Sequence, residues 1–177
     1  MAAGYADWMR AEFGDLIDAL DLDEMQKRFL RSRWLDQVIW LEGKAAQTQR
    51  RYYRLRLITV VGAVVVPALV GLQAFDSWVG DVAQAGAIVI SLIVAVSAAI
   101  EQFFRFGERW QHYRSTAERL KSEGWLYFEL AGEYGRDGAS SGALFPSFAA
   151  RVEDLLQAEV NVFVTQVTAE RKKDDDK

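Results

Sequence analysis

The sequence predicts an all-α membrane protein, in which a two-helix transmembrane hairpin extends by its long helices into a cytosolic helical bundle. Two apolar runs, residues 57–75 and 82–100, carry no charge. Each has about 19 residues, and a helix needs roughly 20 to cross a hydrocarbon core. Outside these runs, apolar side chains recur at the three- and four-residue steps of amphipathic helices. The remaining apolar surface is too small to enclose two such runs in a soluble protein.

The chain begins with an acidic segment, residues 1–22, which we expect to form an amphipathic helix. Residues 1–24 hold one basic and seven acidic side chains, which is not the pattern of a cleavable signal peptide. Residues 23–56 are expected to form a cytosolic helix that leads into the membrane. The sequence "DLDE", Asp21 to Glu24, has the spacing of a capping box at the start of this helix. We expect the helix to continue unbroken into the first transmembrane helix, residues 57–75.

The distribution of basic residues predicts the topology of the hairpin. Residues 25–56 hold nine basic and two acidic side chains, and Arg and Lys also follow the second run. The short outer turn, residues 76–81, contains Asp76 and Asp81 and no basic residue. Because basic flanks stay in the cytoplasm, both termini are expected there. The same flanks supply candidates for anionic lipid headgroups: Arg50, Arg51, Arg54, Arg56, Arg105 and Arg109.

The second transmembrane helix, residues 82–100, is expected to continue without a break into a cytosolic helix over residues 101–134. Residues 135–145 form a loop by composition, since they include "GRDGASSG". A last amphipathic helix is predicted for residues 146–171, with Pro146 in its first turn. Residues 172–177 form a charged tail. The apolar stripe of the last helix and that of residues 1–22 complete the cytosolic bundle.

The composition argues against catalysis. The chain has no Cys, which excludes disulfides and thiolate metal sites, and His112 is its single His. A catalytic site needs several positioned groups, and neither a phosphate-binding glycine loop nor a calcium loop occurs. We therefore expect no enzyme activity, cofactor or metal. The Arg residues are explained by membrane flanking, so we expect no nucleic-acid partner.

An oligomeric pore is the sharper functional hypothesis, because two helices cannot enclose a path alone. Small and polar residues lie near one side of the second span, and they either line water or let helices pack closely in lipid. A similar ladder on the first span is assigned to helix packing. The pore-lining candidates are Gln84, Ala87, Ser91, Ala95, Ala98, Glu101 and Gln102, and the packing candidates are Thr59, Ala63, Pro67 and Gly71.

Acidic residues stand at both ends of this path. Asp76 and Asp81 would form an outer mouth and Glu101 an inner one, and rings of carboxylates favour cations. The alternative for Glu101 is a surface ion pair with Arg105, one turn further on. The uncharged interior between the two mouths suits a hydrophobic gate.

The order of these segments resembles bacterial two-span proteins of the SLATT group (SMODS- and SLOG-associating effector domain) and a sibling two-span domain of unknown function. The likeness covers residues 22–165. Its most specific part follows the second span: Trp110, Tyr113, Arg114, Glu118, Leu120, Lys121 and Glu123. The resemblance implies a membrane effector that forms pores in nucleotide-triggered bacterial defence. The chain carries no fused nucleotide-sensing or nucleotide-making domain, which departs from that pattern.

The expected function is therefore a homo-oligomeric, cation-preferring channel, gated from its cytosolic bundle. That bundle leaves room for a small-molecule or ion ligand. The alternative is a membrane-anchored scaffold whose bundle recruits a protein or lipid partner. A channel and a scaffold differ in one observation, since only the channel transports ions.

Overall fold

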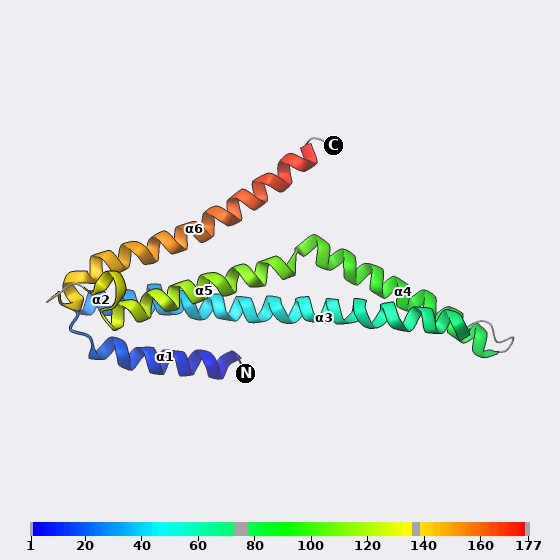
Figure 1. Ribbon diagram of the computed structural model, residues 1–177, viewed down its shortest axis with the longest axis horizontal. Helices are drawn as coiled ribbons and strands as arrows, with labels where there is room; N and C mark the ends of the chain where they lie inside the picture. The colour runs from blue at the N-terminus through cyan, green and yellow to red at the C-terminus, as the bar shows by residue number, and fades with distance from the viewer. Residues whose placement is uncertain (1, 73–77, 136–138, 176–177) are drawn as a thin grey trace. The chain divides into compact units, whose positions relative to one another are not determined.

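The computed structural model describes residues 2–72, 78–135 and 139–175, and side chains for residues 4–72, 78–135 and 139–159. The described residues form helices and no strand. The chain divides into two compact units: unit 1 is Met1–Gly43 with Tyr113–Lys177, and unit 2 is Lys44–His112. The helices, labelled in Figure 1, are α1 (Ala2–Ala19), α2 (Glu24–Phe29), η1 (Leu30–Leu35), α3 (Asp36–Leu72), α4 (Trp78–Phe104), α5 (Phe106–Phe128), η2 (Gly132–Tyr134) and α6 (Ser141–Asp175).

The first long helix is continuous from Glu24 to Leu72, as the sequence predicts, and its beginning is more specific than predicted. Asp23 is the N-cap, and its side chain accepts from the backbone N–H of Gln26, while the Gln26 side chain accepts from the backbone of Asp23. The capping box therefore uses Asp23 and Gln26, and the expected pair of Asp21 and Glu24 is wrong. The two possible boxes overlap in "DLDEMQ", so spacing did not separate them.

A π-helical segment, η1, joins α2 to α3 without breaking the rod. The backbone N–H of Asp36 donates to the carbonyl of Arg31, five residues earlier, which is the π spacing. Leu30, Trp34 and Leu35 are buried on this wider turn. Spacing of apolar residues alone does not reveal such a turn, because it adds only one residue to a long helical pattern.

The core of unit 1 joins α1, η1, the start of α3, α5 and α6. Its centre is Trp34, which is fully buried and donates through Nε1 to the carbonyl of Leu120 at 2.9 Å. The rings of Phe13 and Phe128 contact Trp34 edge to face, with centroid distances of 5.3 and 5.4 Å. A Cβ at Gly124 would lie 2.1 Å from Cζ2 of Trp34, so only glycine leaves room for the indole there. The helical bundle predicted from the amphipathic stripes is thus present in unit 1, and its cytosolic location stays a prediction.

Unit 2 contains the predicted hairpin, formed by α3 and α4. A Cβ at Gly62 would lie 2.1 Å from Cγ2 of Val94, and a Cβ at Gly86 would lie 3.6 Å from Leu69. These pairs run in opposite chain directions, which defines an antiparallel contact (Figure 1). Glycines at such contacts allow close approach of helix backbones. α3 continues through Pro67 as helix.

The second long helix is interrupted, which corrects the expectation of an unbroken helix from the second span to residue 134. α4 ends at Phe104 and α5 begins at Phe106, and Arg105 between them has φ of 49°, in the left-handed region. Figure 1 shows the chain turning at this point. Neither Pro nor Gly occupies the break, so the usual sequence signals for interruption are missing.

The C-terminal helix also differs from the expectation. α6 begins at Ser141, within the loop expected over residues 135–145, and Pro146 lies inside the helix. The Ser140 carbonyl accepts from the backbone N–H groups of Ala143 and Leu144, which starts the helix ahead of Pro146. Phe148, Val152 and Leu156 of the expected stripe are buried in the core. The later stripe positions, from residue 160 on, lie outside the described side chains.

Candidate functional site

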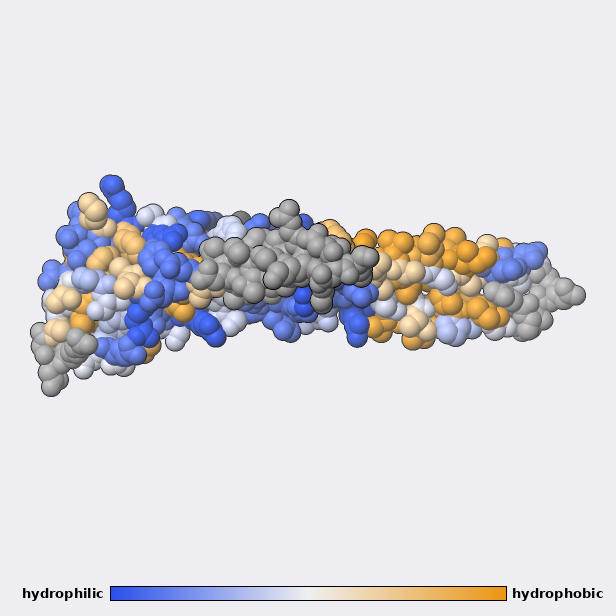
Figure 2. All heavy atoms as spheres, turned by 90° about the horizontal axis from the view of Figure 1, so that it is seen from above, coloured by the Kyte–Doolittle hydropathy of each residue, from blue (hydrophilic) through white to orange (hydrophobic). Residues whose placement is uncertain are grey.

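The apolar parts of α3 and α4 are exposed rather than buried. The helix Glu24–Leu72 and the helix α4 each contain an 18-residue apolar window, of which 6% and 17% respectively is buried. Both are long and apolar enough to cross a membrane. Val64, Ile88 and Leu92 are each more than 60% exposed, and Figure 2 shows hydrophobic surface over this part of unit 2. A core helix of a soluble protein would be mostly buried, so this surface needs a covering that a single chain does not supply.

The basic flanks lie beside the apolar stretches, within α3 before its stretch and just after the end of α4, and they face outward. All six Arg side chains suggested as lipid headgroup contacts are exposed. The Arg105 guanidinium donates to the Glu108 carboxylate at 2.7 Å. An exposed position is what a headgroup contact requires, and headgroup binding stays a prediction.

The predicted pore face of α4 is divided between two environments. Ala87 is buried within unit 2 and Glu101 is half-buried. The other five side chains are exposed, about a quarter turn from the residues buried in the hairpin: Gln84, Ser91, Ala95, Ala98 and Gln102. We call these five residues the polar stripe.

The acidic residues expected at the two mouths are placed as follows. Asp81 is exposed in the first turn of α4, where its charge is favourable at the positive end of the helix dipole. Asp76 lies outside the described residues. Glu101 stands at the inner end of α4, and its carbonyl accepts from the backbone N–H of Arg105 at 2.8 Å.

The packing ladder predicted for the first span mostly faces away from α4. Ala63, Pro67 and Gly71 are exposed, and a Cβ at Gly71 would meet nothing within 4 Å. The hydroxyl of Thr59 donates to the carbonyl of Leu55. Within one chain the close contact uses Gly62 instead, which the sequence reading did not single out. The ladder is free to contact a second copy, and that role stays a prediction.

Aromatic rings surround the helix break at the inner end of α4. Phe104 and Phe106 stack with centroids 5.3 Å apart and planes at 18°. Phe103 contacts Phe104 edge to face. A left-handed residue costs about 1–2 kcal/mol, and an aromatic pair contributes about 0.5–1.5 kcal/mol. The two terms act in opposite directions, so the aromatic stack offsets part of the cost of the left-handed residue.

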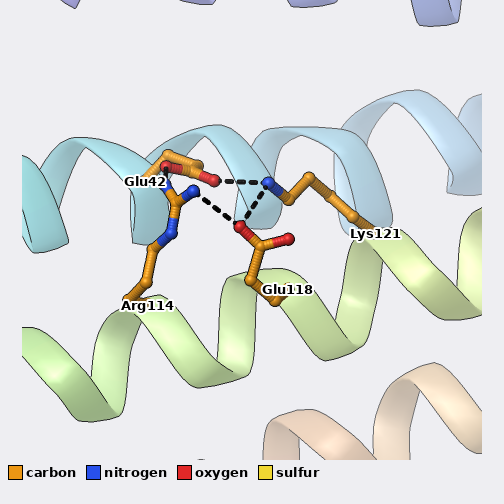
Figure 3. A network of polar contacts seen from close by, with 4 residues as sticks. All are labelled: Glu42, Arg114, Glu118 and Lys121. Carbon is orange, nitrogen blue, oxygen red and sulfur yellow. Dashed lines mark hydrogen bonds and ion pairs between the residues drawn. The ribbon is translucent and has the colours of Figure 1, made fainter.

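A network of four charged residues joins α3 to α5 in unit 1 (Figure 3). Glu42, which is 7% exposed, accepts from Arg114 Nη1 and from Lys121 Nζ, both at 2.7 Å. Glu118 contacts the same two cations at 2.7 and 2.9 Å. Burial alone lowers the pKa of Lys121, but its hydrogen bonds to Glu42 and Glu118 and the charges of both outweigh this and raise it. Each cation therefore bridges two carboxylates.

A second buried carboxylate, Glu123, ties the end of α5 to α6. It accepts from the Tyr134 hydroxyl at 2.5 Å and from Arg151 Nε at 2.7 Å. Burial, and next the hydrogen bond to Glu123, raise the pKa of Tyr134. Burial also raises the pKa of Tyr127, whose hydroxyl donates to the carbonyl of Ser141 at 2.8 Å. These contacts hold α5, η2 and the start of α6 together.

An open groove of about 400 Å³ lies in unit 1 between α3, α5 and α6. Trp40 and Tyr113 form an edge-to-face pair on it, with centroids 6.1 Å apart. Arg33, which also lines it, makes two hydrogen bonds of 2.7 Å to Glu153, and these lower the pKa of that carboxyl. The groove has room for a small ligand.

A protein-family model described as "Protein of unknown function (DUF4231)" matches residues 36–142. The chain belongs to this family. No curated protein and no solved structure matches it. The DUF4231 segment covers α3, α4 and α5, so the family is defined by the hairpin and the helices that continue it. The expected sibling domain of unknown function is compatible with this match, and the likeness to SLATT proteins stays a prediction.

The DUF4231 segment contains all seven residues that carried the sequence resemblance. Arg114, Glu118 and Lys121 are members of the charged network, and Leu120 is fully buried in the core. Sequence analysis missed Glu42, their partner on α3. Its position in the helical pattern does not distinguish a buried, ion-paired Glu from a Glu that faces solvent. It also missed the pairing of Trp34 with Gly124, although a glycine inside a helical pattern was a usable signal.

The described residues contain no cluster of three or more His, Asp or Glu side chains able to hold a metal ion. His112 is half-buried at the end of unit 2.

Proposed function

We propose that this protein is a homo-oligomeric two-span membrane protein that conducts ions, with a preference for cations and with α4 lining the path. The observation that carries the proposal is the exposure of the polar stripe on a helix whose other exposed residues, apart from Asp81 in its first turn, are apolar. The bilayer would be a bacterial inner membrane with both termini cytoplasmic, in agreement with the basic inner flanks.

Lipid is a poor covering for the polar stripe. Gln84, Ser91 and Gln102 carry groups that need hydrogen-bond partners, which hydrocarbon does not offer. Their exposure on one side of α4 supports contact with water or with another copy of the chain. Several copies around an axis would place the stripe inward and leave residues such as Leu92 facing lipid.

The charges at the ends of α4 support a preference for cations. Asp81 at the outer end and Glu101 at the inner end would each repeat around the axis, and no charged residue lies on α4 between them. Acidic rings concentrate cations, and an uncharged interior between them suits a gate that closes by dewetting.

Ion flux into proteoliposomes tests the proposal, with potassium, sodium and chloride compared. Ser91→Trp places a large ring on the polar stripe and is expected to reduce cation flux at least about tenfold by blocking the path. Val96→Trp is the matched control, because Val96 is 49% exposed on the same helix, about 140° around it from Ser91. Its flux is expected to stay within about twofold of wild type.

Glu101→Gln is expected to lower the ratio of cation to chloride flux, since it removes the charge of the inner mouth. Equal loss of flux in the Ser91 and Val96 variants would contradict a path along the polar stripe. An absence of flux from the wild type under every ionic condition would contradict constitutive conduction.

The alternative is a membrane-anchored scaffold, and the groove of unit 1 supports it. A groove lined by Trp40, Tyr113 and Arg33 offers aromatic and charged contacts to a partner. A scaffold predicts that Trp40→Ala abolishes partner binding, whereas Ser91→Trp has no flux to block.

A further inference from the structure

We propose that Arg105 is a two-state hinge between α4 and α5. In the bent state Arg105 is left-handed, as in the structure, and in the straight state it is right-handed, so that α4 and α5 form one helix. The proposal concerns the backbone of unit 2 and does not depend on ion conduction. Its consequence for gating, given below, rests on the proposed function.

The bend is closed by hydrogen bonds on both sides. The Arg105 N–H donates to the Glu101 carbonyl at 2.8 Å, which completes the last turn of α4. The Arg105 carbonyl accepts from the N–H groups of Glu108 and Arg109, both at 3.1 Å, which starts α5. Arg105 therefore serves as the end of one helix and the start of the next, while residues on both sides are regular helix.

The stacked pair of Phe104 and Phe106 belongs to the bent state. In a continuous α-helix, residues two positions apart point about 200° apart and do not face each other. Their parallel stack at 5.3 Å is therefore a product of the left-handed Arg105. This contact offsets part of the steric penalty of the left-handed residue, so a change at Arg105 or at either ring is expected to shift the balance between the two states.

Two contacts with α3 distinguish the bent state from the straight state. After the break, a Cβ at Gly107 would lie 3.0 Å from Cε2 of Tyr52, so the first turn of α5 lies close against α3. Before the break, α4 lies against α3 at Gly62 and Val94. Straightening has to release one of these contacts, which makes the change a switch between two packed arrangements rather than free bending.

The switch bears on the inner mouth. Glu101 lies one turn before the hinge, and its carbonyl closes the last turn in the bent state. If α4 lines the path, straightening re-aims this turn and changes the width and charge of the inner mouth. The hinge would then be the gate that the cytosolic bundle controls through α5.

Spin-label distances test the hinge in the full chain. The protein has no Cys, so Val89→Cys combined with Gln111→Cys gives two labelled sites, on exposed positions either side of the break. The labelled chain is purified in detergent and diluted into unlabelled protein to remove distances between copies. A straight helix puts these backbones roughly 33 Å apart, and the bent state is shorter.

Two substitutions at Arg105 remove the same guanidinium and differ in backbone preference. Asn tolerates the left-handed region, whereas a β-branched residue strongly disfavours it. Arg105→Asn is expected to keep the short distance. Arg105→Val is expected to raise the ratio of the long to the short distance by about tenfold. Glu108→Gln, which removes only the side-chain ion pair, is expected to resemble wild type.

Loss of the aromatic stack gives an independent measurement. Phe104→Leu is expected to shift the distribution towards the long distance by several-fold. Phe103→Leu is the control, because that ring is 80% exposed and leaves the stack of Phe104 and Phe106 in place. A wild-type distance of about 33 Å, or an Arg105→Asn variant at that distance, would overturn the hinge. So would an Arg105→Val variant that folds with the wild-type distribution.

The hinge and the channel fail separately. If substitutions at Arg105 change the spin-label distance but no ion flux is found, the hinge is supported and its role as a gate is contradicted. If Ser91→Trp blocks ion flux but substitutions at Arg105 leave the spin-label distance unchanged, the path along α4 is supported and the hinge is contradicted.

Discussion

The Glu42 carboxylate is buried on α3 while both of its cationic partners come from α5, and one of them, Arg114, is half exposed. A buried charge without its partners is strongly destabilising, so this residue sets the cost of separating the two helices. The exposed Glu118 adds a second acceptor to the same cations and carries far less desolvation cost. The two Glu residues thus differ in burial while they share partners.

Glu42→Gln is expected to destabilise unit 1 by about 1–3 kcal/mol, because it leaves Arg114 and Lys121 without their buried counter-charge. Glu118→Gln, the matched control, is expected to cost less than about 1 kcal/mol, as an exposed ion pair does. Thermal unfolding followed by circular dichroism in detergent measures both. Equal effects of the two changes would show that burial of Glu42 is unimportant.

At the scale of helices, the contact between α3 and α4 depends on one small residue. Gly62→Ala is expected to destabilise the hairpin by about 1–3 kcal/mol, since the new Cβ would overlap Val94, whose branched side chain has few alternative rotamers. Gly71→Ala is the control, because its Cβ meets nothing within 4 Å and Ala favours helix by up to about 1 kcal/mol. Resistance to unfolding by denaturing detergent should fall for the first variant and hold or rise for the second.

Long apolar and amphipathic elements were predictable from the sequence, whereas their interruptions were not. The rod from Glu24 to Leu72 and the helical α4 follow from the spacing and length of apolar runs. The break at Arg105 is accompanied by the stack of Phe104 on Phe106, and neither Pro nor Gly marks it in the sequence. The early start of α6 is similar, since Pro is usually a first-turn residue and Ser140 supplies the start instead.

The candidate site was predicted to a similar extent. Helical spacing placed Gln84, Ser91 and Gln102 on one side of α4, and all three are exposed there. Spacing did not show which edge of that side α3 covers. Ala87 was predicted on the same face, and it is buried. The rotation of one helix against another depends on the partner's shape, here the gap at Gly62, and that information is not local in sequence.

At the scale of the whole molecule, the bundle of unit 1 is expected to be sensitive to alkali. The pKa values of Lys121, Tyr127 and Tyr134 are all raised in the folded chain. A group of this kind contributes fully below its unfolded pKa, which is about 10 for Tyr and 10.4 for Lys, and its contribution falls as the pH rises above that value. The three groups therefore act in the same direction.

Unfolding midpoints are expected to fall steeply between about pH 9.5 and about pH 11.5 for the wild type. Tyr127→Phe lowers stability at neutral pH through loss of its hydrogen bond to Ser141, and it should make the alkaline fall shallower. Trp125→Phe, at an exposed and non-titrating position, should leave the slope unchanged. A Tyr127→Phe variant with the wild-type slope would contradict the assignment.

The wide turn of η1 affects which sides of the helix the residues before and after it occupy. Because that turn holds one residue more than an α-helical turn, the faces before and after it are in different phase. An ordinary α-helix over the same residues would rotate α2 by about 100° relative to α3, whereas deletion of one residue there, such as the exposed Ser32, would let α-helix replace the wide turn with the phase kept. Conversion of the turn to α-helix with all its residues kept would leave the helix content nearly intact and still misalign the capping box of Asp23 and the burial of Leu30.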